Sequence, residues 1–148
     1  MQEEFKLNTT FKYKFRPRFS DIDRYGIAHH SRYFYWFEEA RFYWLNKALK
    51  LSIEEQLELY APISNLSAEY KKPIVFEQDY IILCHVTVGD FKPTIKFDYK
   101  IMDISEDTLF SLGYTEHVFT NSKGELLFEI PEYLIEYFKS LIIKESRD

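Results

Sequence analysis

The sequence contains few of the residues that mark disulfide-bonded, disordered or membrane-spanning proteins. It has one cysteine, four glycines and five prolines among 148 residues. A single cysteine cannot form an internal disulfide, and the low glycine and proline content excludes collagenous and low-complexity chains. No run of about 18 apolar residues is present to span a bilayer, and the first residues lack the basic-then-apolar order of a signal peptide. We therefore expect an ordered cytoplasmic protein.

Basic residues are also in deficit, which bears on possible partners. There are 19 lysines and arginines against 24 acidic residues, giving a net charge of -5. Polyphosphates are repelled at long range, so we expect no nucleic-acid partner. The glycine-rich nucleotide motifs and the Gly-x-Ser-x-Gly elbow are missing, and the four histidines do not follow metal-ligand spacing. We expect no cofactor and no metal.

Aromatic residues, in contrast, are abundant and make up 19% of the chain. In such numbers they can line an apolar tunnel, or fill a core and a subunit interface, which is the interpretation we favour. The length is that of one domain, which we take to be residues 1–148. Cys84 lies in an apolar run and is expected to behave as a small buried hydrophobe.

Apolar spacing predicts a strand followed by two helices in the first half of the chain. Residues 11–16 alternate aromatic and cationic side chains, which is typical of a half-buried strand. Residues 33–47 have helical spacing with apolar residues on nearly all sides, so this helix should be nearly surrounded. Residues 52–59 predict a second helix, since Ser52 and Glu55 form a capping box.

The second half of the chain predicts an antiparallel sheet. Alternating patterns and turn residues give strands at 66–71, 80–88, 95–101, 108–120 and 125–130, with turns at 89–90, 105–107 and 121–124. Residues 131–143 predict a closing helix that begins at a proline. The fold class is α+β, with the sheet curled around the first helix. Its exposed edges suggest that the chain is at least a homodimer.

The segment between the first strand and the first helix has the composition of a functional site. It holds Asp21 and Asp23, then Gly26, then the adjacent residues His29 and His30 at the predicted helix start. A carboxylate next to free helix N–H groups can serve acyl transfer. The alternative is that Asp21 or Asp23 only caps a turn.

These residues resemble a known family. Residues 23–33 (Asp-Arg-Tyr-Gly-Ile-Ala-His-His-Ser-Arg-Tyr), the following Trp-Phe-Glu-Glu-Ala-Arg, and the stretch from residue 62 to 79 are similar to hotdog-fold acyl-CoA thioesterases of the 4-hydroxybenzoyl-CoA thioesterase type. The resemblance covers residues 11–130 approximately. It implies a hotdog fold, in which an antiparallel sheet wraps around a long central helix.

The resemblance also implies roles for individual residues. Asp23 matches the catalytic carboxylate, acting as nucleophile or as general base, and the His30 amide would polarise the thioester carbonyl. Gly26, Tyr33 and Lys92 would contribute to substrate binding. The chain departs from the family at two positions, with Arg32 where asparagine is usual and Phe19 where one subgroup has tyrosine.

The predicted activity is hydrolysis of an acyl-CoA to a free acid and coenzyme A by a homodimer or homotetramer. One alternative is an acyl carrier protein thioester as substrate, docked on a basic strip formed by Lys12, Lys14, Arg16 and Arg18. Another alternative is a non-catalytic dimer that binds acyl groups or acts as a scaffold.

Overall fold

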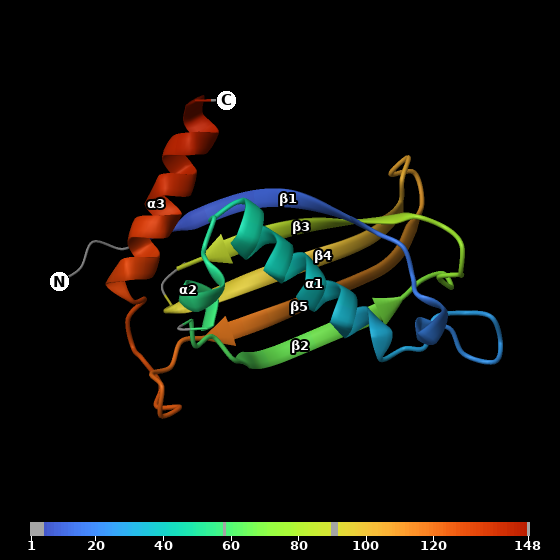
Figure 1. Cartoon of the computed structure of the whole chain (residues 1–148), viewed down its shortest axis with the longest axis horizontal. Coiled ribbons are helices and arrows are strands. Elements are labelled where there is room, and N and C mark those ends of the chain that lie inside the picture. The colour runs from blue at the N-terminus through green and yellow to red at the C-terminus, as the bar shows by residue number, and fades with distance from the viewer. Residues whose placement is uncertain (1–4, 58, 90–91, 148) are drawn as a thin grey trace.

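Figure 1 shows a computed structural model of the chain, which describes residues 5–57, 59–89 and 92–147. Its strands are β1 (Leu7–Phe15), β2 (Ile63–Tyr70), β3 (Tyr80–Val88), β4 (Thr94–Asp103) and β5 (Leu109–Val118). Its helices are η1 (Phe19–Asp21), α1 (Arg32–Lys47), α2 (Ile53–Leu57) and α3 (Glu132–Arg147). The strands form one antiparallel sheet in the order β1-β3-β4-β5-β2. The predicted α+β class is confirmed.

Helix α1 crosses one face of this sheet (Figure 1) and forms the centre of the core. Its buried side chains are those of Tyr33, Trp36, Phe37, Ala40 and Trp44. The ring of Phe37 stacks on Tyr99 of β4, with centroids 4.1 Å apart and planes 6° apart. Each large aromatic buried in this way stabilises the fold by roughly 2–3 kcal/mol.

Gly113 of β5 leaves room for this packing. A Cβ atom at Gly113 would lie 2.7 Å from Cε2 of Phe37 and 2.8 Å from the carbonyl oxygen of Ser67. Neither approach is tolerated by a real side chain. The close approach of Phe37 and Ser67 therefore explains a glycine in the middle of β5.

The prediction that the first helix is nearly surrounded is wrong for the single chain. Tyr35, Phe42 and Tyr43 on α1 are 56%, 52% and 40% exposed. One sheet covers only one side of a helix, so a sequence that is apolar nearly all round still leaves its far side open.

The predicted strand at 125–130 is also wrong. This segment makes one isolated bridge, between Thr120 and Leu126, and its Phe128 is 82% exposed. The physical reason is that β5 already pairs with β4 on one side and β2 on the other. The returning chain therefore finds no free edge next to β5.

The other predicted elements are present with shifted ends. Strand β1 begins four residues earlier than predicted, and α3 extends past residue 143. Helix α2 is shorter than the predicted 52–59, and residue 58 lies outside the described residues, as does residue 90 of the predicted turn at 89–90. The capping box is confirmed, since the Ser52 and Glu55 side chains each accept the other's backbone N–H. No helix of the described segments is long and apolar enough to cross a membrane.

Candidate functional site

The loop between β1 and α1 folds back on itself as a tight hairpin. The Asp23 N–H donates to the Ile27 carbonyl at 2.9 Å, and the Gly26 N–H donates to the Asp23 carbonyl at 3.1 Å. Gly26 has φ +83°, a conformation that side chains with a Cβ disfavour. A glycine at this position therefore has a backbone reason.

The structure separates the roles of the two aspartates. Asp21 is 7% exposed, and its Oδ2 accepts hydrogen bonds from the Arg18 N–H at 2.8 Å and the Trp36 indole at 3.4 Å. Arg32 Nε lies 3.7 Å from its other oxygen. This carboxylate is committed to holding η1 against α1, which is the capping role that the sequence left open.

Asp23 is less engaged than Asp21. Its Oδ1 accepts a hydrogen bond from the Tyr25 N–H at 2.8 Å, which fixes the side chain in an Asx-type turn. Within the described part of the chain, Oδ2 has no hydrogen-bond partner. One oxygen orients the group while the other stays available.

Asp23, His30 and Tyr33 line a common cavity of about 430 Å³. Its remaining lining residues are Ile27, Ala28, Tyr70, Lys71, Lys72 and Pro73. Three residues of the predicted site are thus brought together by the loop and the start of α1. Tyr70 is the last residue of β2, and Lys71 and Lys72 follow it directly. In the sequence these three residues belonged to the stretch that resembles the family, but they were not predicted as site residues.

His30 lies in the turn that leads into α1. The Arg32 N–H donates to the His29 carbonyl at 3.0 Å, which begins the helix. Among the described residues, nothing accepts a hydrogen bond from the His30 backbone N–H. A free amide at the positive end of a 16-residue helix is a donor for a developing negative charge.

Tyr33 forms the inner wall of the cavity. Its side chain is 3% exposed and packs 5.0 Å from Trp36 and 4.7 Å from Tyr70, measured between ring centroids. Burial, followed by the nearby Tyr70, raises the pKa of Tyr33 to about 12. The phenol is therefore neutral at physiological pH and supplies an apolar surface with one hydroxyl.

Lys92 is not part of this cavity. It follows β3, whereas the cavity lies beyond the other end of that strand, where Val75 contacts Tyr80. A nine-residue strand spans about 30 Å, and Figure 1 shows the two places at opposite ends of the sheet. Within one chain, Lys92 therefore lies far from the cavity that Asp23 lines.

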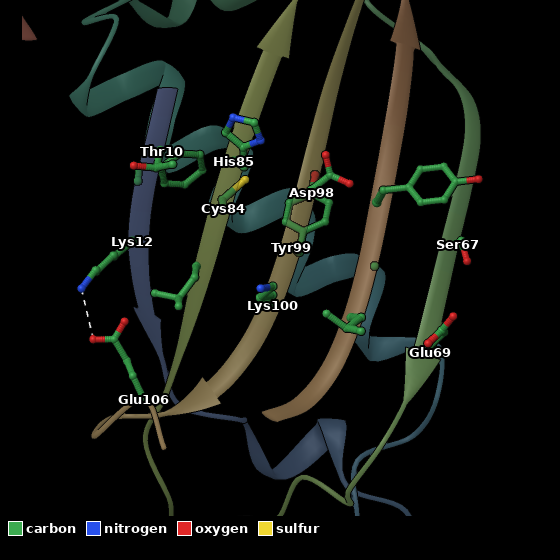
Figure 2. A pocket seen from close by; sticks show the side chains of 15 residues that line it. Thr10, Lys12, Ser67, Glu69, Cys84, His85, Asp98, Tyr99, Lys100 and Glu106 are labelled. Carbon is green, nitrogen blue, oxygen red and sulfur yellow. Dashed lines mark hydrogen bonds and ion pairs between the residues drawn. The ribbon is translucent and has the colours of Figure 1, made fainter. Parts of the chain in front are cut away.

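A larger groove, of about 590 Å³, lies on the sheet face opposite α1 (Figure 2). It includes Leu83, Leu112 and Tyr114 and is bordered by an ion pair of 3.1 Å between Lys12 and Glu106. Cys84 and His85 both belong to its lining, but they are adjacent in β3, so their side chains point to opposite faces. Burial of Cys84 raises the pKa of its thiol well above the ordinary value. The groove offers no activated thiolate.

A chain of buried hydrogen bonds runs from α1 across the sheet. Arg41 donates to the Tyr99 hydroxyl at 3.1 Å, Tyr99 lies 2.7 Å from the Thr115 hydroxyl, and Thr115 lies 3.0 Å from Nε2 of His117. Nδ1 of His117 is 2.8 Å from the Ala61 carbonyl. Burial lowers the pKa of His117 to about 4, so the ring is neutral at physiological pH. Because a carbonyl only accepts, Nδ1 carries the proton, Nε2 accepts from Thr115, and Tyr99 in turn donates to Thr115.

On α1, Glu38 and Arg41 form an ion pair of 3.9 Å at i, i+3. In the sheet, His117 is buried and His85 is exposed. Over the described ranges, no group of three or more His, Cys, Asp or Glu residues is arranged to hold a metal ion.

The chain matches the family model of the thioesterase-like superfamily over residues 17–138. A curated relative from Aquifex aeolicus (strain VF5), with the name "Putative esterase", is 29% identical over 130 residues. That match covers 87% of this chain and 98% of the relative.

Solved structures share the fold. The crystal structure of a hypothetical protein from Aquifex aeolicus has a TM-score of 0.74 at 28% identity, covering 86% of this chain and 98% of the other. The 1,4-dihydroxy-2-naphthoyl-CoA thioesterase from Synechocystis has a TM-score of 0.76 at 18% identity, covering 91% and 96%. At that identity the second likeness establishes the arrangement of helices and strands. The resemblance noted in the sequence is confirmed at the level of the family.

Proposed function

Because this chain belongs to the thioesterase-like superfamily, we propose that it hydrolyses an acyl-CoA to the free acid and coenzyme A. The observation that carries the proposal is the shared cavity, which is lined by both Asp23 and His30, the latter two residues before the start of α1. Structural neighbours with names such as 1,4-dihydroxy-2-naphthoyl-CoA thioesterase and gentisyl-coenzyme A thioesterase support a CoA thioester as substrate.

The mechanism follows from the two groups. The thioester carbonyl carbon sits near Oδ2 of Asp23, with its oxygen directed at the His30 N–H. Asp23 either attacks the carbon or removes a proton from a water that attacks it. The carbonyl electrons move to the oxygen, where the amide stabilises the negative charge, and return as the carbon–sulfur bond breaks to release the CoA thiolate. In the nucleophilic route, water then hydrolyses the mixed anhydride and restores Asp23.

Coenzyme A fits this surface better than an acyl carrier protein. The basic strip of Lys12, Lys14, Arg16 and Arg18 was the feature that favoured an acidic protein partner. Each of these cations has a carboxylate partner in the structure, at 3.1, 3.6, 2.8 and 3.7 Å respectively. Lys14 and Arg16 share Asp79, so three carboxylates offset four cations, and the strip gives only weak long-range attraction for an acidic carrier.

We infer that two copies pair through the edge strand β2. This strand borders the sheet, and its Ile63, Leu66 and Tyr70 are 41%, 44% and 48% exposed. The end of β2 also borders the cavity, so a partner on this edge would complete the site. Light scattering should give a mass in solution of about twice that of the chain, or four times for a tetramer of two such dimers. A monomer in solution would refute the pairing.

The activity is tested with purified protein and a panel of straight-chain, branched and aromatic acyl-CoAs, with a chromogenic thiol reagent to detect free CoA. Turnover of at least one member is expected. The same acyl group carried on acyl carrier protein should react more slowly. Saturable binding of acyl-CoA without thiol release would instead favour the non-catalytic acyl-binding protein.

Asp23→Asn tests the carboxylate directly. We expect turnover to fall by about 10² or more, because the amide is neither a nucleophile nor a base at this pH. Asp98→Asn is the matched control, since Asp98 lines the groove on the opposite sheet face. Equal activity of Asp23→Asn and the wild-type protein would remove Asp23 from the mechanism.

A further inference from the structure

Tyr70, the last residue of β2, reaches the junction between the loop and α1. Its hydroxyl donates a hydrogen bond to the His30 carbonyl oxygen at 2.9 Å. Figure 1 shows the end of β2 next to the start of α1. The Tyr33 ring lies edge-on against Tyr70 at 4.7 Å, and both rings line the cavity that contains Asp23. Tyr70 thus connects the sheet edge to the start of the helix.

The backbone that carries Tyr70 is firmly held. The Lys71 and Lys72 N–H groups both donate to the Phe110 carbonyl, at 2.9 and 3.1 Å. On the other side, the Ser111 hydroxyl donates to the Glu69 carbonyl at 2.8 Å. A side chain that starts from such a support can fix the position of what it binds.

The two peptide planes beside the His30 Cα atom are held by different hydrogen bonds. The plane before it contains the His29 carbonyl and the His30 N–H, and it is held by the Arg32 N–H at 3.0 Å. The plane after it contains the His30 carbonyl, which Tyr70 binds, and the Ser31 N–H, which donates to Nδ1 of His29 at 3.3 Å. Because a peptide unit is planar, fixing both planes fixes the direction of the His30 N–H.

We propose that Tyr70 is a positioning residue that aims the His30 amide at the substrate oxygen. The assignment rests on the thioester hydrolysis proposed above and adds a residue to it. Without the hydroxyl, the turn that carries His30 loses its hydrogen bond to the sheet edge. The turn can then shift relative to the cavity, and the His30 amide loses alignment with the charge that develops in the transition state. The ground-state complex does not depend on this alignment, so the loss should appear in kcat and not in KM.

Tyr70→Phe tests the assignment. For the best acyl-CoA of the panel we expect kcat to fall about tenfold with KM changed less than about twofold, since losing an oxyanion donor entirely costs about 10²–10³. If Tyr70 only stabilised the fold, the substitution would lower Tm and leave kcat and KM of the folded protein unchanged. Tyr114→Phe is the matched control, because its hydroxyl accepts a hydrogen bond from Asn65 of the same strand β2, outside the cavity. Its kcat should equal that of the wild-type protein.

A double variant separates the amide from the carboxylate. With enzyme in excess over substrate, Tyr70→Phe should lower the residual rate of Asp23→Asn by about the same tenfold factor, because the amide acts without the carboxylate. If Tyr70 only held the Asp23 loop, no further loss would occur, and the assignment would be overturned. An active wild-type protein with an unchanged kcat in Tyr70→Phe would also overturn it while leaving the thioesterase intact. A wild-type protein inactive on every acyl-CoA would remove both.

Discussion

The buried histidine His117 makes the stability of this protein sensitive to mild acid. Its side chain is 5% exposed, and its Nδ1–H donates to the Ala61 carbonyl while Nε2 accepts from Thr115. Protonation would bury a charge away from water and near the positive charge of Arg41, and Thr115 would have to turn its hydroxyl proton away from Nε2. The folded protein therefore resists binding this proton, whereas the unfolded chain does not.

The magnitude follows from the two pKa values. His117 has a pKa of about 4 in the folded protein, compared with an ordinary value of 6.5. As pH falls below the ordinary value, the unfolded chain binds the proton first, so the free energy of unfolding decreases until both states are protonated. Between pH 7 and pH 5 this loss amounts to about 2 kcal/mol.

Urea denaturation at a series of pH values measures the effect. Other groups also titrate in this range, so the wild-type protein is compared with His117→Gln, which cannot bind the proton. The quantity of interest is the loss of unfolding free energy between pH 7 and pH 5 in the wild-type protein minus the same loss in the variant. We expect about 2 kcal/mol for this difference. Tyr99→Phe is the control, since it breaks the same hydrogen-bond chain at a cost of about 1 kcal/mol but keeps the titrating group. An equal pH dependence in the wild-type protein and His117→Gln would refute the reasoning.

Two further predictions concern packing. Gly113→Ala should lower the free energy of unfolding by about 1–3 kcal/mol in urea, because the new methyl meets Phe37 and the Ser67 carbonyl. Gly124→Ala, where nothing lies within 4 Å but φ is +83°, should cost only about 1 kcal/mol. Cys84 is 2% exposed with a raised pKa, so a chromogenic thiol reagent should react with it at the rate of global unfolding. Immediate reaction with the native protein would contradict its burial.

Local patterns in the sequence were sufficient for most of the elements. The alternation along β1, β3 and β4 and the helical spacing of α1 reflect which side chains face the core, and that is a property of neighbours in sequence. The false strand at 125–130 has a suitable local pattern as well. It failed because strand pairing depends on which edges are free, and both edges of β5 are occupied.

For the site, the sequence proposed Asp23 and His30 but left Asp21 and Asp23 equivalent as capping residues. The structure distinguishes them by burial, because Asp21 meets Trp36 from the next helix while Asp23 lines the cavity. Tyr70 was outside the predicted site, since it lies forty positions from His30 and only the end of the sheet edge brings them together. Lys92 remained a candidate on sequence grounds, although a full strand length separates it from the cavity.

The fold class, the helix α1 and the loop with its aspartates and glycine could be predicted, because each of these depends on residues close together in the chain. Three properties became visible only in the folded chain: which aspartate is available, which tyrosine binds the His30 carbonyl, and how the hydrogen bonds from Arg41 to His117 are ordered. Those properties depend on burial and on contacts between distant segments, which the local sequence does not predict.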